Sequence, residues 1–266
     1  KINYIESAKI ENTSTTIKDF FQNNSVETKV MNSYYGSDVN TPINLKNEKT
    51  IFSDESTIET AYQYAYEKGN QKLIDANMVG IPLDTEVKKD GKTISKAETK
   101  YDNPVNLLPS SVLSYNMQSN TPSTEVTYDI YDGKRNLIQY TTKAGVSTSI
   151  IWGYNQTQPI AKIEGAKLSD ITQTLINSIV NASDDTNANY SESTLLNQLD
   201  AFRIALPNFQ ISTYTYKPLI GVTTITPPSG IREYYFYDTA NRLESVKTNE
   251  NGVLTTLKEY QYHYKP

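Results

Sequence analysis

The chain has 266 residues, a formal net charge of −5 at pH 7, 37% hydrophobic residues and 21% charged residues. The length suffices for one or two domains, and the composition is more polar than average without being that of a disordered chain. The absence of cysteine excludes disulfides, thiolate metal sites and cysteine nucleophiles. The sequence has no basic cluster and no long apolar run, so we expect no nucleic-acid partner and no transmembrane segment.

Tyrosine is the unusual residue, with 21 copies against six phenylalanines and one tryptophan. It suits pleated, half-buried strands, because the ring packs while the hydroxyl stays hydrated. The N-terminal stretch has neither the charged and apolar regions of a signal peptide nor an initiator methionine, which favours a processed chain or a fragment of a longer one.

Short alternating segments, separated by Asn, Gly, Asp and Pro, predict strands along most of the chain. A short helix is expected at 70–80. The candidate strand pairs are 85–102, which turns at Asp90-Gly91, then 111–132, 146–165, and 242–264, which turns at Asn251-Gly252.

A helical hairpin is predicted at 168–206, where the alternating pattern of the strands is absent. Ser169 and Ser191 are the expected N-caps, Pro207 closes the second helix, and the linker between the helices is polar. The apolar residues at helical spacing are Ile171, Leu175, Ile179, Leu195, Leu199, Phe202 and Leu206.

An internal repeat links two stretches of the second half. IYDGKRNLIQYTTKAG at 130–145 aligns with FYDTANRLESVKTNENG at 236–252, with one added residue. In each copy an aromatic strand ends in Tyr-Asp, the carboxylate is expected to cap the following turn, and Leu opens the return strand. One such hairpin cannot bury its aromatic face alone, so neighbours must stack on it. The aligned pairs are Tyr131 with Tyr237, Asp132 with Asp238, and Leu137 with Leu243.

This pattern resembles the YD-repeat (Rhs) family, whose units read approximately Tyr-x-Tyr-Asp-x-x-Gly-Arg-Leu. Asn241 and Arg135 stand where that pattern has Gly, Asn136 stands for Arg, and Asp129 for the leading Tyr. The matching positions are Tyr235, Tyr237, Asp238, Arg242 and Leu243 in the second copy, and Tyr131, Asp132 and Leu137 in the first.

Residues 128–266, with the closing EYQYHYKP, are similar to one branch of this family from outer-membraned bacteria. The resemblance implies a large exported protein whose repeats coil into a β shell. Many members enclose a C-terminal toxin, but neither a toxin nor a self-cleavage motif is seen here. We therefore expect a toxin-less scaffold that is secreted or displayed on the cell surface, handled by an outer-membrane, type IX-like export machinery.

The expected fold is mainly β: YD-repeat hairpins coiled into part of a shell, with the helical hairpin inserted. The rest of a longer repeat chain is the first expected partner, because repeats need neighbours. The expected segments are 1–127 with degenerate repeat strands, 128–167 with YD hairpins, 168–206 with the helical insert, and 207–266 with the C-terminal YD hairpins.

Candidate catalytic chemistry is sparse. The one histidine, His263, lies in a terminal tyrosine-rich strand, where packing or surface exposure is the expected role. The segment 184–192, DDTNANYSE, loosely resembles a calcium loop but lacks its glycine and bidentate glutamate, so a solvated linker is favoured. We expect no enzyme activity, no catalytic residue, no metal and no cofactor.

Two further readings concern binding and modification. Two runs of alternating tyrosines are expected to share a strand face, either packing across strands or stacking on glycans. Asp238-Thr239-Ala240 resembles a short bacterial O-glycosylation signal at Thr239. The scaffold is the preferred function, a toxin-delivery cocoon and a carbohydrate-binding module being the alternatives. The runs are Tyr62, Tyr64 and Tyr66, then Tyr260, Tyr262 and Tyr264.

Overall fold

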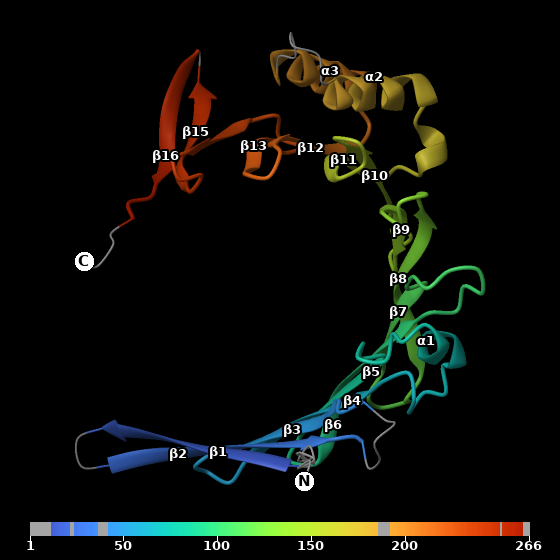
Figure 1. The fold of residues 1–266 in the computed structure, drawn as a ribbon, viewed down its shortest axis with the longest axis vertical. Coiled ribbons are helices and arrows are strands. Elements are labelled where there is room, and N and C mark those ends of the chain that lie inside the picture. Colours follow the sequence, from blue (N-terminus) through green and yellow to red (C-terminus); the bar gives the residue numbers. More distant parts are fainter. Residues whose placement is uncertain (1–11, 22–23, 37–41, 186–191, 251, 263–266) are drawn as a thin grey trace, which may run out of the picture. The chain divides into compact units, whose positions relative to one another are not determined.

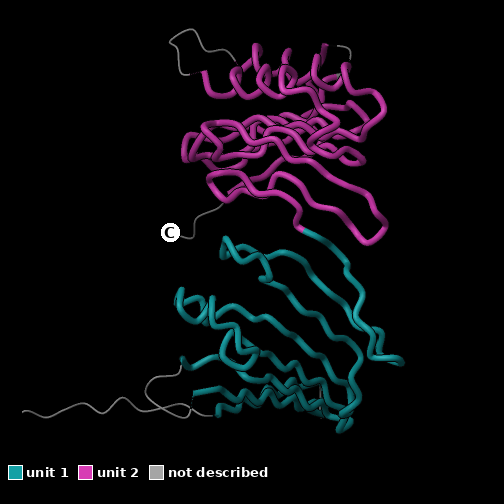
Figure 2. The backbone as a smooth tube through the Cα atoms, turned by 90° about the vertical axis from the view of Figure 1, so that its right-hand side faces the viewer, with its two compact units in different colours: residues 1–127 teal, residues 128–266 magenta. Residues whose placement is uncertain are grey.

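The structure is a computed structural model that describes residues 12–21, 24–36, 42–185, 192–250 and 252–262. Strands dominate it, and each strand β1 to β16 pairs with the next in chain order. The expectation of a mainly β fold with an inserted helical hairpin is confirmed. Two compact units, 1–127 and 128–266, are distinguished in Figure 2. The division of the chain into four segments that we expect from the sequence stays a prediction.

The first unit is an antiparallel meander with one short helix, α1 (Gln71–Asp75). Asn70 caps α1 by accepting a hydrogen bond from the Leu73 amide, which confirms the predicted helix. Asp90 and Gly91 have φ values of 49° and 78° and form the predicted hairpin turn. The strands are β1 (Asn12–Phe21), β2 (Asn24–Tyr34), β3 (Leu45–Ile51), β4 (Thr57–Gln63), β5 (Asp84–Lys89), β6 (Lys92–Lys100), β7 (Ser111–Tyr115) and β8 (Pro122–Tyr131), whose end belongs to the second unit.

The second unit continues the meander and carries the helical insert between β11 and β12 (Figure 1). The predicted strand pairs at 146–165 and 242–264 are present as hairpins, although Asn251 lies outside the described residues. The elements are β9 (Leu137–Thr142), β10 (Ser147–Gly153), β11 (Gln158–Glu164), a 3-10 turn (Leu168–Asp170), α2 (Gln173–Asp184), α3 (Glu192–Ala205), β12 (Gln210–Lys217), β13 (Gly221–Thr226), β14 (Glu233–Tyr237), β15 (Leu243–Glu250) and β16 (Val253–Glu259).

The aliphatic core of the second unit lies where α2 and α3 pack against the sheet at β10, β11 and β12. Both helices have an apolar stripe that the sheet covers, as the helical spacing predicts. Each fully buried side chain of this size contributes about 1.5–3 kcal/mol relative to exposure. The fully buried members include Ile160, Ile163, Ile179, Leu195, Leu199 and Phe202.

The predicted start of the first inserted helix is wrong. Ser169 lies inside the 3-10 turn, and α2 begins only after Thr172. The Asp170 carboxylate accepts a hydrogen bond from the Lys167 amide and closes that turn as a separate unit, so the helix starts later. Ser191 lies outside the described residues, and Pro207 follows the end of α3 as expected.

Candidate functional site

The aspartate of the first repeat copy caps the turn between β8 and β9. Its Oδ1 accepts hydrogen bonds from the amides of Lys134 and Asn136, both at 2.8 Å. Its Oδ2 accepts from the Asn136 side chain at 3.0 Å. The main chain closes the same loop, because the Asp132 amide donates to Asn136 O and the Arg135 amide donates to Asp132 O.

The second copy repeats this arrangement bond for bond. Asp238 Oδ1 accepts from the amides of Ala240 and Arg242, and the main-chain bonds from Asp238 to Arg242 and from Asn241 to Asp238 are both 2.9 Å long. Arg242 adds an ion pair to Asp238 Oδ2 at 2.6 Å, where the first copy has only the neutral Asn136. The Arg242 hydrogen bond lowers the pKa of Asp238. The expectation that these carboxylates cap turns is confirmed.

The turn geometry explains why the family pattern has glycine three residues after the aspartate. Arg135 and Asn241 occupy that position with φ values of 71° and 59°, in the left-handed region. Asparagine tolerates this region better than most residues, whereas arginine pays a steric penalty that glycine would not. Both copies thus lack glycine at a position that is left-handed in each of them.

Two other loops have the same main-chain bonds without the Tyr-Asp sequence. In 142–146 the Thr142 amide donates to Val146 O, and Gly145 stands at the left-handed position with φ 78°. In 52–56 the Phe52 amide donates to Ser56 O, and Glu55 has φ 66°. The sequence signal for the second loop is weak, because its aspartate is not the first residue of the turn, as Asp132 and Asp238 are. Asp54 is the third residue, and it accepts a hydrogen bond from the Ser56 amide.

The tyrosine of the repeat fixes the neighbouring strand. The Tyr237 hydroxyl, at the end of β14, donates to the Val222 carbonyl at the start of β13 at 2.9 Å. Its ring lies over Gly221, where a Cβ would collide with the hydroxyl. A glycine in a strand covered by a cross-strand aromatic ring is a known stabilising arrangement of sheets.

The same contact, which we call the aromatic lock, recurs between other neighbouring strands. In each case an aromatic donor at, or just beyond, the end of an even-numbered strand reaches a carbonyl at the start of the preceding odd-numbered strand. Burial raises the pKa of Tyr64 and of Tyr237. Burial, together with the nearby Tyr214, raises the pKa of Tyr216 to about 12. These hydroxyls therefore keep their protons at neutral pH. The other locks are Tyr64 to Leu45, Trp152 to Leu137, Tyr216 to Pro159, and Tyr262 to Leu243.

The remaining matched positions of the repeat also fall in defined places. Leu137 and Leu243 open β9 and β15, as predicted. Tyr235 donates to Glu233 in its own strand at 2.7 Å. Asp129, which replaces the leading tyrosine of the first copy, accepts hydrogen bonds from Gln139 and Thr141. Tyr131 ends β8, in the position equivalent to Tyr237.

The predicted tyrosine faces are wrong in the first run. Only Tyr62 belongs to β4, which ends at Gln63; Tyr64 is buried in the following turn, and Tyr66 is exposed there. The Glu67 carboxylate accepts a hydrogen bond from the Tyr64 amide, which ends the strand pattern at that point.

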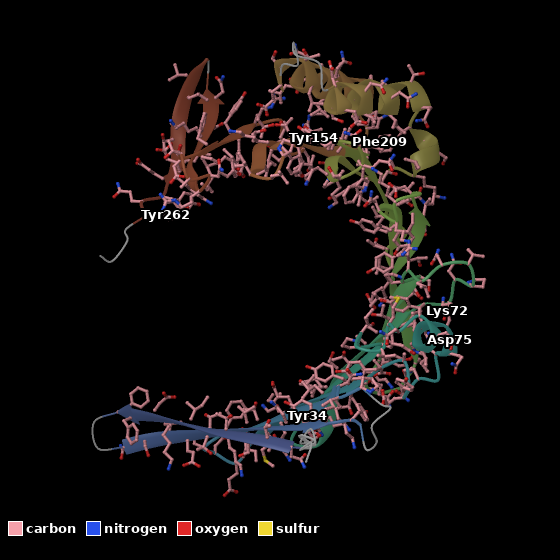
Figure 3. The ribbon with its side chains drawn as sticks, in the orientation of Figure 1. Tyr34, Lys72, Asp75, Tyr154, Phe209 and Tyr262 are labelled. Atoms are coloured by element: carbon pink, nitrogen blue, oxygen red, sulfur yellow. The ribbon has the colours of Figure 1, made fainter. Side chains whose placement is uncertain are left out.

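In the second run, Tyr260 and Tyr262 follow the end of β16 instead of lying within it, and both are partly exposed. The Arg242 guanidinium lies 4.5 Å from the centre of the Tyr262 ring, which joins this lock to the Asp238 turn. Tyr262 is labelled near the C-terminal end of the chain in Figure 3. Tyr264 and His263 lie outside the described residues, as does most of the 184–192 segment. Thr239 is exposed in the Asp238 turn.

Sequence reasoning missed an ion cluster in the first unit, on β5 and β6. Glu98 and Asp84 are 4% and 5% exposed, and each of them lies within ion-pair distance of two lysines. Lys68 and Lys100 reach Glu98 Oε1 at 2.8 and 2.9 Å, and the Tyr115 hydroxyl donates to Oε2 at 2.7 Å. Lys68 and Lys96 each lie 3.5 Å from Asp84. No single-sequence motif marks this cluster, because its members come from four separate segments: the turn after β4, β5, β6 and β7.

The cluster is built for ion pairing. Burial alone would raise the pKa of Glu98, but hydrogen bonds from Lys68, Tyr115 and Lys100 lower it to about 2. The hydrogen bond to Glu98, followed by burial, raises the pKa of Tyr115 to about 12. A general acid or base works best with a pKa near the operating pH, and these groups are moved away from it. The arrangement therefore suits structure or binding more than proton transfer.

Within the described residues, no group of three or more histidine, aspartate or glutamate side chains is placed to hold a metal ion. No helix in the described ranges has both the length and the apolar character needed to cross a bilayer.

No family model and no curated protein sequence matches the chain. Among solved structures, the fold is similar to the complex described as TcdB2-TccC3-Cdc42, with 12% identity and a TM-score of 0.39 over 89% of this chain and 12% of that chain. It is also similar to a Tc holotoxin pore of Photorhabdus luminescens, with 12% identity and a TM-score of 0.36 over 93% of this chain and 14% of that one.

A porin-like protein from Bacteroides uniformis is 12% identical, with a TM-score of 0.27 over 92% of both chains. The chain thus spans about 12% of the length of the toxin complex chain it matches. The YD-repeat interpretation therefore rests on the repeat residues themselves.

Proposed function

We propose that this chain is a non-catalytic scaffold segment of a YD-repeat (Rhs-like) protein. The observation that carries the proposal is the use made of the repeat side chains. Asp132 and Asp238 bind the main chain of the turns that follow them, and Tyr237 binds the main chain of the preceding strand. Groups that look reactive in the sequence are thus engaged in holding hairpins together.

The two end strands support a role in a larger sheet. β1 and β16 each pair with one neighbour in the described structure, and every described side chain on them is exposed. Unpaired edges of this kind template the addition of further strands. A neighbouring part of a longer repeat chain would cover both. The exposed apolar residues involved are Ile17, Phe20 and Phe21 on β1, and Val253, Leu254 and Leu257 on β16.

The absence of catalysis is part of this proposal. The pKa of Glu98 is lowered to about 2 and that of Tyr115 is raised to about 12, which supports ion pairing over acid–base chemistry. Secretion or cell-surface display, type IX-like export, the toxin-cocoon alternative and glycan stacking stay predictions of the sequence resemblance.

The test is association of the purified chain through its end strands. Sedimentation velocity over a hundredfold range of concentration, about 1–100 μM, should show reversible self-association. Phe20→Lys combined with Leu257→Lys should abolish it, because lysine on an edge opposes strand addition. The control is Phe52→Lys, which changes an exposed phenylalanine in the 52–56 turn, 41% exposed against 77% for Phe20. A chain that stays monomeric throughout, or a control that acts like the edge variant, contradicts the proposal.

A second arm tests for catalysis directly. The wild-type chain should turn over no glycoside, ester or peptide in a chromogenic panel above the rate of a boiled sample. Turnover that Glu98→Gln removes while the chain stays folded would contradict the non-catalytic assignment.

A further inference from the structure

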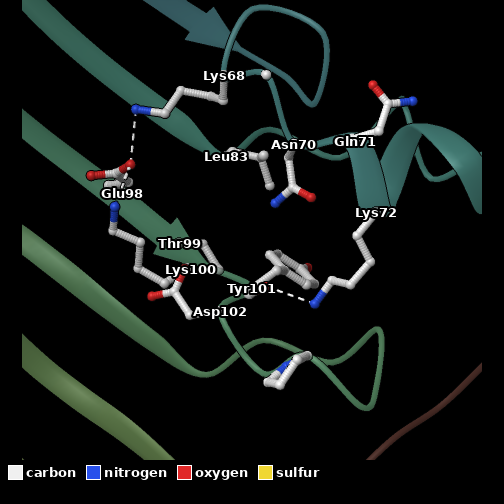
Figure 4. Close-up of a pocket in the computed structure, with 12 residues that line it drawn as sticks. Lys68, Asn70, Gln71, Lys72, Leu83, Glu98, Thr99, Lys100, Tyr101 and Asp102 are labelled. Atoms are coloured by element: carbon white, nitrogen blue, oxygen red, sulfur yellow. Dashed lines mark hydrogen bonds and ion pairs between the residues drawn. The ribbon is translucent and has the colours of Figure 1, made fainter.

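The ion cluster opens into a cavity of about 430 Å³ in the first unit. One wall carries Lys68 from the turn after β4, and another is the end of β6 with the segment that follows it (Figure 4). The opposite side is the first turn of α1. Side chains with hydrogen-bonding groups dominate the lining, among them Asn70, Thr99 and Asp102.

Two ammonium groups meet at this cavity on a single oxygen atom. Lys68 and Lys100 both bind Glu98 Oε1, which holds their nitrogens close together despite their equal charge. Glu98 Oε2 accepts a hydrogen bond from the Tyr115 hydroxyl, and both lysines bind the other oxygen. Two like charges on one acceptor oxygen form a place where a second anion would be stabilised.

The two ammonium groups keep donors for such an anion. Each carries three N–H groups. Lys100 has Glu98 as its one acceptor among the described residues, and Lys68 has Glu98 and a longer contact with Asp84. Their side chains are 33% and 28% exposed, so solvent or a ligand can reach them.

Lys72 provides an internal contrast. It also lines the cavity, but its ammonium donates to the carbonyls of Tyr101, Asn103 and Asn106 at 2.6–3.0 Å. All three of its donors are engaged, and it fixes the loop that forms one wall. The cavity therefore has one structural lysine and two with remaining donors.

We propose that this cavity binds the carboxylate of a small hydroxylated acid, a sugar acid of about one ring. The carboxylate would bridge Lys68 and Lys100, and hydroxyl groups would pair with Thr99 and Asp102. Lys68, Lys96 and Lys100 against Asp84 and Glu98 leave one positive charge in the cluster, which a monoanion neutralises. The volume and polar lining favour a single sugar ring over a long or apolar ligand. This inference is independent of the scaffold role.

The probe is D-glucuronate, titrated into the ¹⁵N-labelled full chain and followed by NMR shifts of the amides of 68–72 and 98–102. We expect saturable shifts confined to these segments. D-Glucose at equal concentration should give none, because it lacks the carboxylate. Acetate should bind more weakly, because it lacks the hydroxyl groups.

The variant is Lys100→Gln, and its matched control is Lys92→Gln, an exposed lysine at the far end of the same strand. Loss of one charge-assisted hydrogen bond should raise the Kd for glucuronate about tenfold or more in the first and leave it unchanged in the second. Lys100→Arg should retain part of the affinity. Equal melting temperatures for the variant and wild type show that lost binding is not lost folding.

Three results would overturn the inference: no saturable binding of glucuronate, equal effects of Lys100→Gln and Lys92→Gln, or equal binding of glucose. Binding of acetate as tight as that of glucuronate would overturn the sugar-acid assignment. An acidic peptide that binds these amides and is not displaced by glucuronate would also overturn it.

Discussion

The two units hold the same kind of meander together by different means. In the second unit, α2 and α3 bury a cluster of aliphatic and aromatic side chains against the sheet. In the first, the buried apolar cluster is small, centred on Ala65, Leu73 and Leu83, and an ion cluster lies beside it. An antiparallel meander can therefore have either an apolar interior or one that includes buried ion pairs, because the hydrogen bonds between its strands are the same in both units.

The largest expected effect is loss of the aromatic centre of the helical insert. Phe202→Ala removes a ring that is 1% exposed and should lower the free energy of unfolding of the second unit by about 3–5 kcal/mol. Trp152 is the one tryptophan and lies in that unit, so its fluorescence in urea reports the change. Hydrogen exchange in β3–β6 should stay at the wild-type rate. Equal loss of protection there would contradict the separation of the two interiors.

A smaller effect is expected from neutralising the ion cluster. Glu98→Gln keeps the shape but weakens charge-assisted hydrogen bonds from Lys68 and Lys100, and should cost the first unit about 2 kcal/mol. Hydrogen exchange of β5 and β6 measures it, while Trp152 fluorescence should not move. Lys88→Gln removes an ion pair at the surface and serves as the control with little effect.

The same carboxylate predicts an acid-sensitive first unit. The pKa of Glu98 falls from 4.5 to about 2 on folding, so its contribution to stability is complete above pH 4.5 and is lost as the pH falls toward 2. Exchange protection of β5 and β6 should therefore decline over this window, ahead of the second unit. Glu98→Gln should flatten the decline. An equally steep decline in that variant would assign the acid sensitivity to other groups.

The aromatic lock offers a milder test within the second unit. Tyr237→Phe keeps the ring over Gly221 and removes the hydrogen bond to the Val222 carbonyl. We expect a loss of about 1 kcal/mol, measured by urea unfolding of the second unit. Tyr234→Phe in the same strand, for which no such lock exists in the described structure, is the control. Equal losses would show that the hydroxyl contact to β13 is not the source of stability.

The smallest expected change is a gain. Arg135→Gly places glycine at a left-handed position of the first repeat turn and should stabilise the second unit by about 0.5–1 kcal/mol. Asn241→Gly at the equivalent position should gain less, because asparagine already tolerates that conformation. A rise in the midpoint of urea unfolding checks both. Destabilisation by Arg135→Gly would mean that the arginine side chain contributes more than its backbone strain costs.

Local signals in the sequence predicted the hairpins and the two turn caps. Asp90-Gly91 and the Tyr-Asp pairs carry their geometry in adjacent residues, so one sequence is enough to find them. The α2 and α3 cores were visible in apolar spacing for the same reason. The end of β4 was missed because the Glu67 contact to the Tyr64 amide overrides an alternating pattern.

The candidate binding cavity could not be predicted from the sequence. Lys68, Glu98 and Tyr115 are distant in sequence and lack characteristic spacing, and only pairing of β5, β6 and β7 brings their segments together. The aromatic locks were also missed, since each joins a side chain to a carbonyl of another strand. Composition indicated many tyrosines but gave no sign of which main-chain oxygen each one reaches.

The locks and the Asp turns fall on one border of the sheet in the second unit, where even strands end and odd strands begin. Tyr237 connects β14 to the preceding strand β13 by a hydrogen bond, and Asp238 caps the turn that leads from β14 to β15. This border thus carries both kinds of side-chain contact, whereas the opposite border is joined by the helical insert and by loops without a Tyr-Asp cap. Under tension, neighbouring strands should therefore begin to separate at the border that lacks these contacts and stop separating at the border that has them.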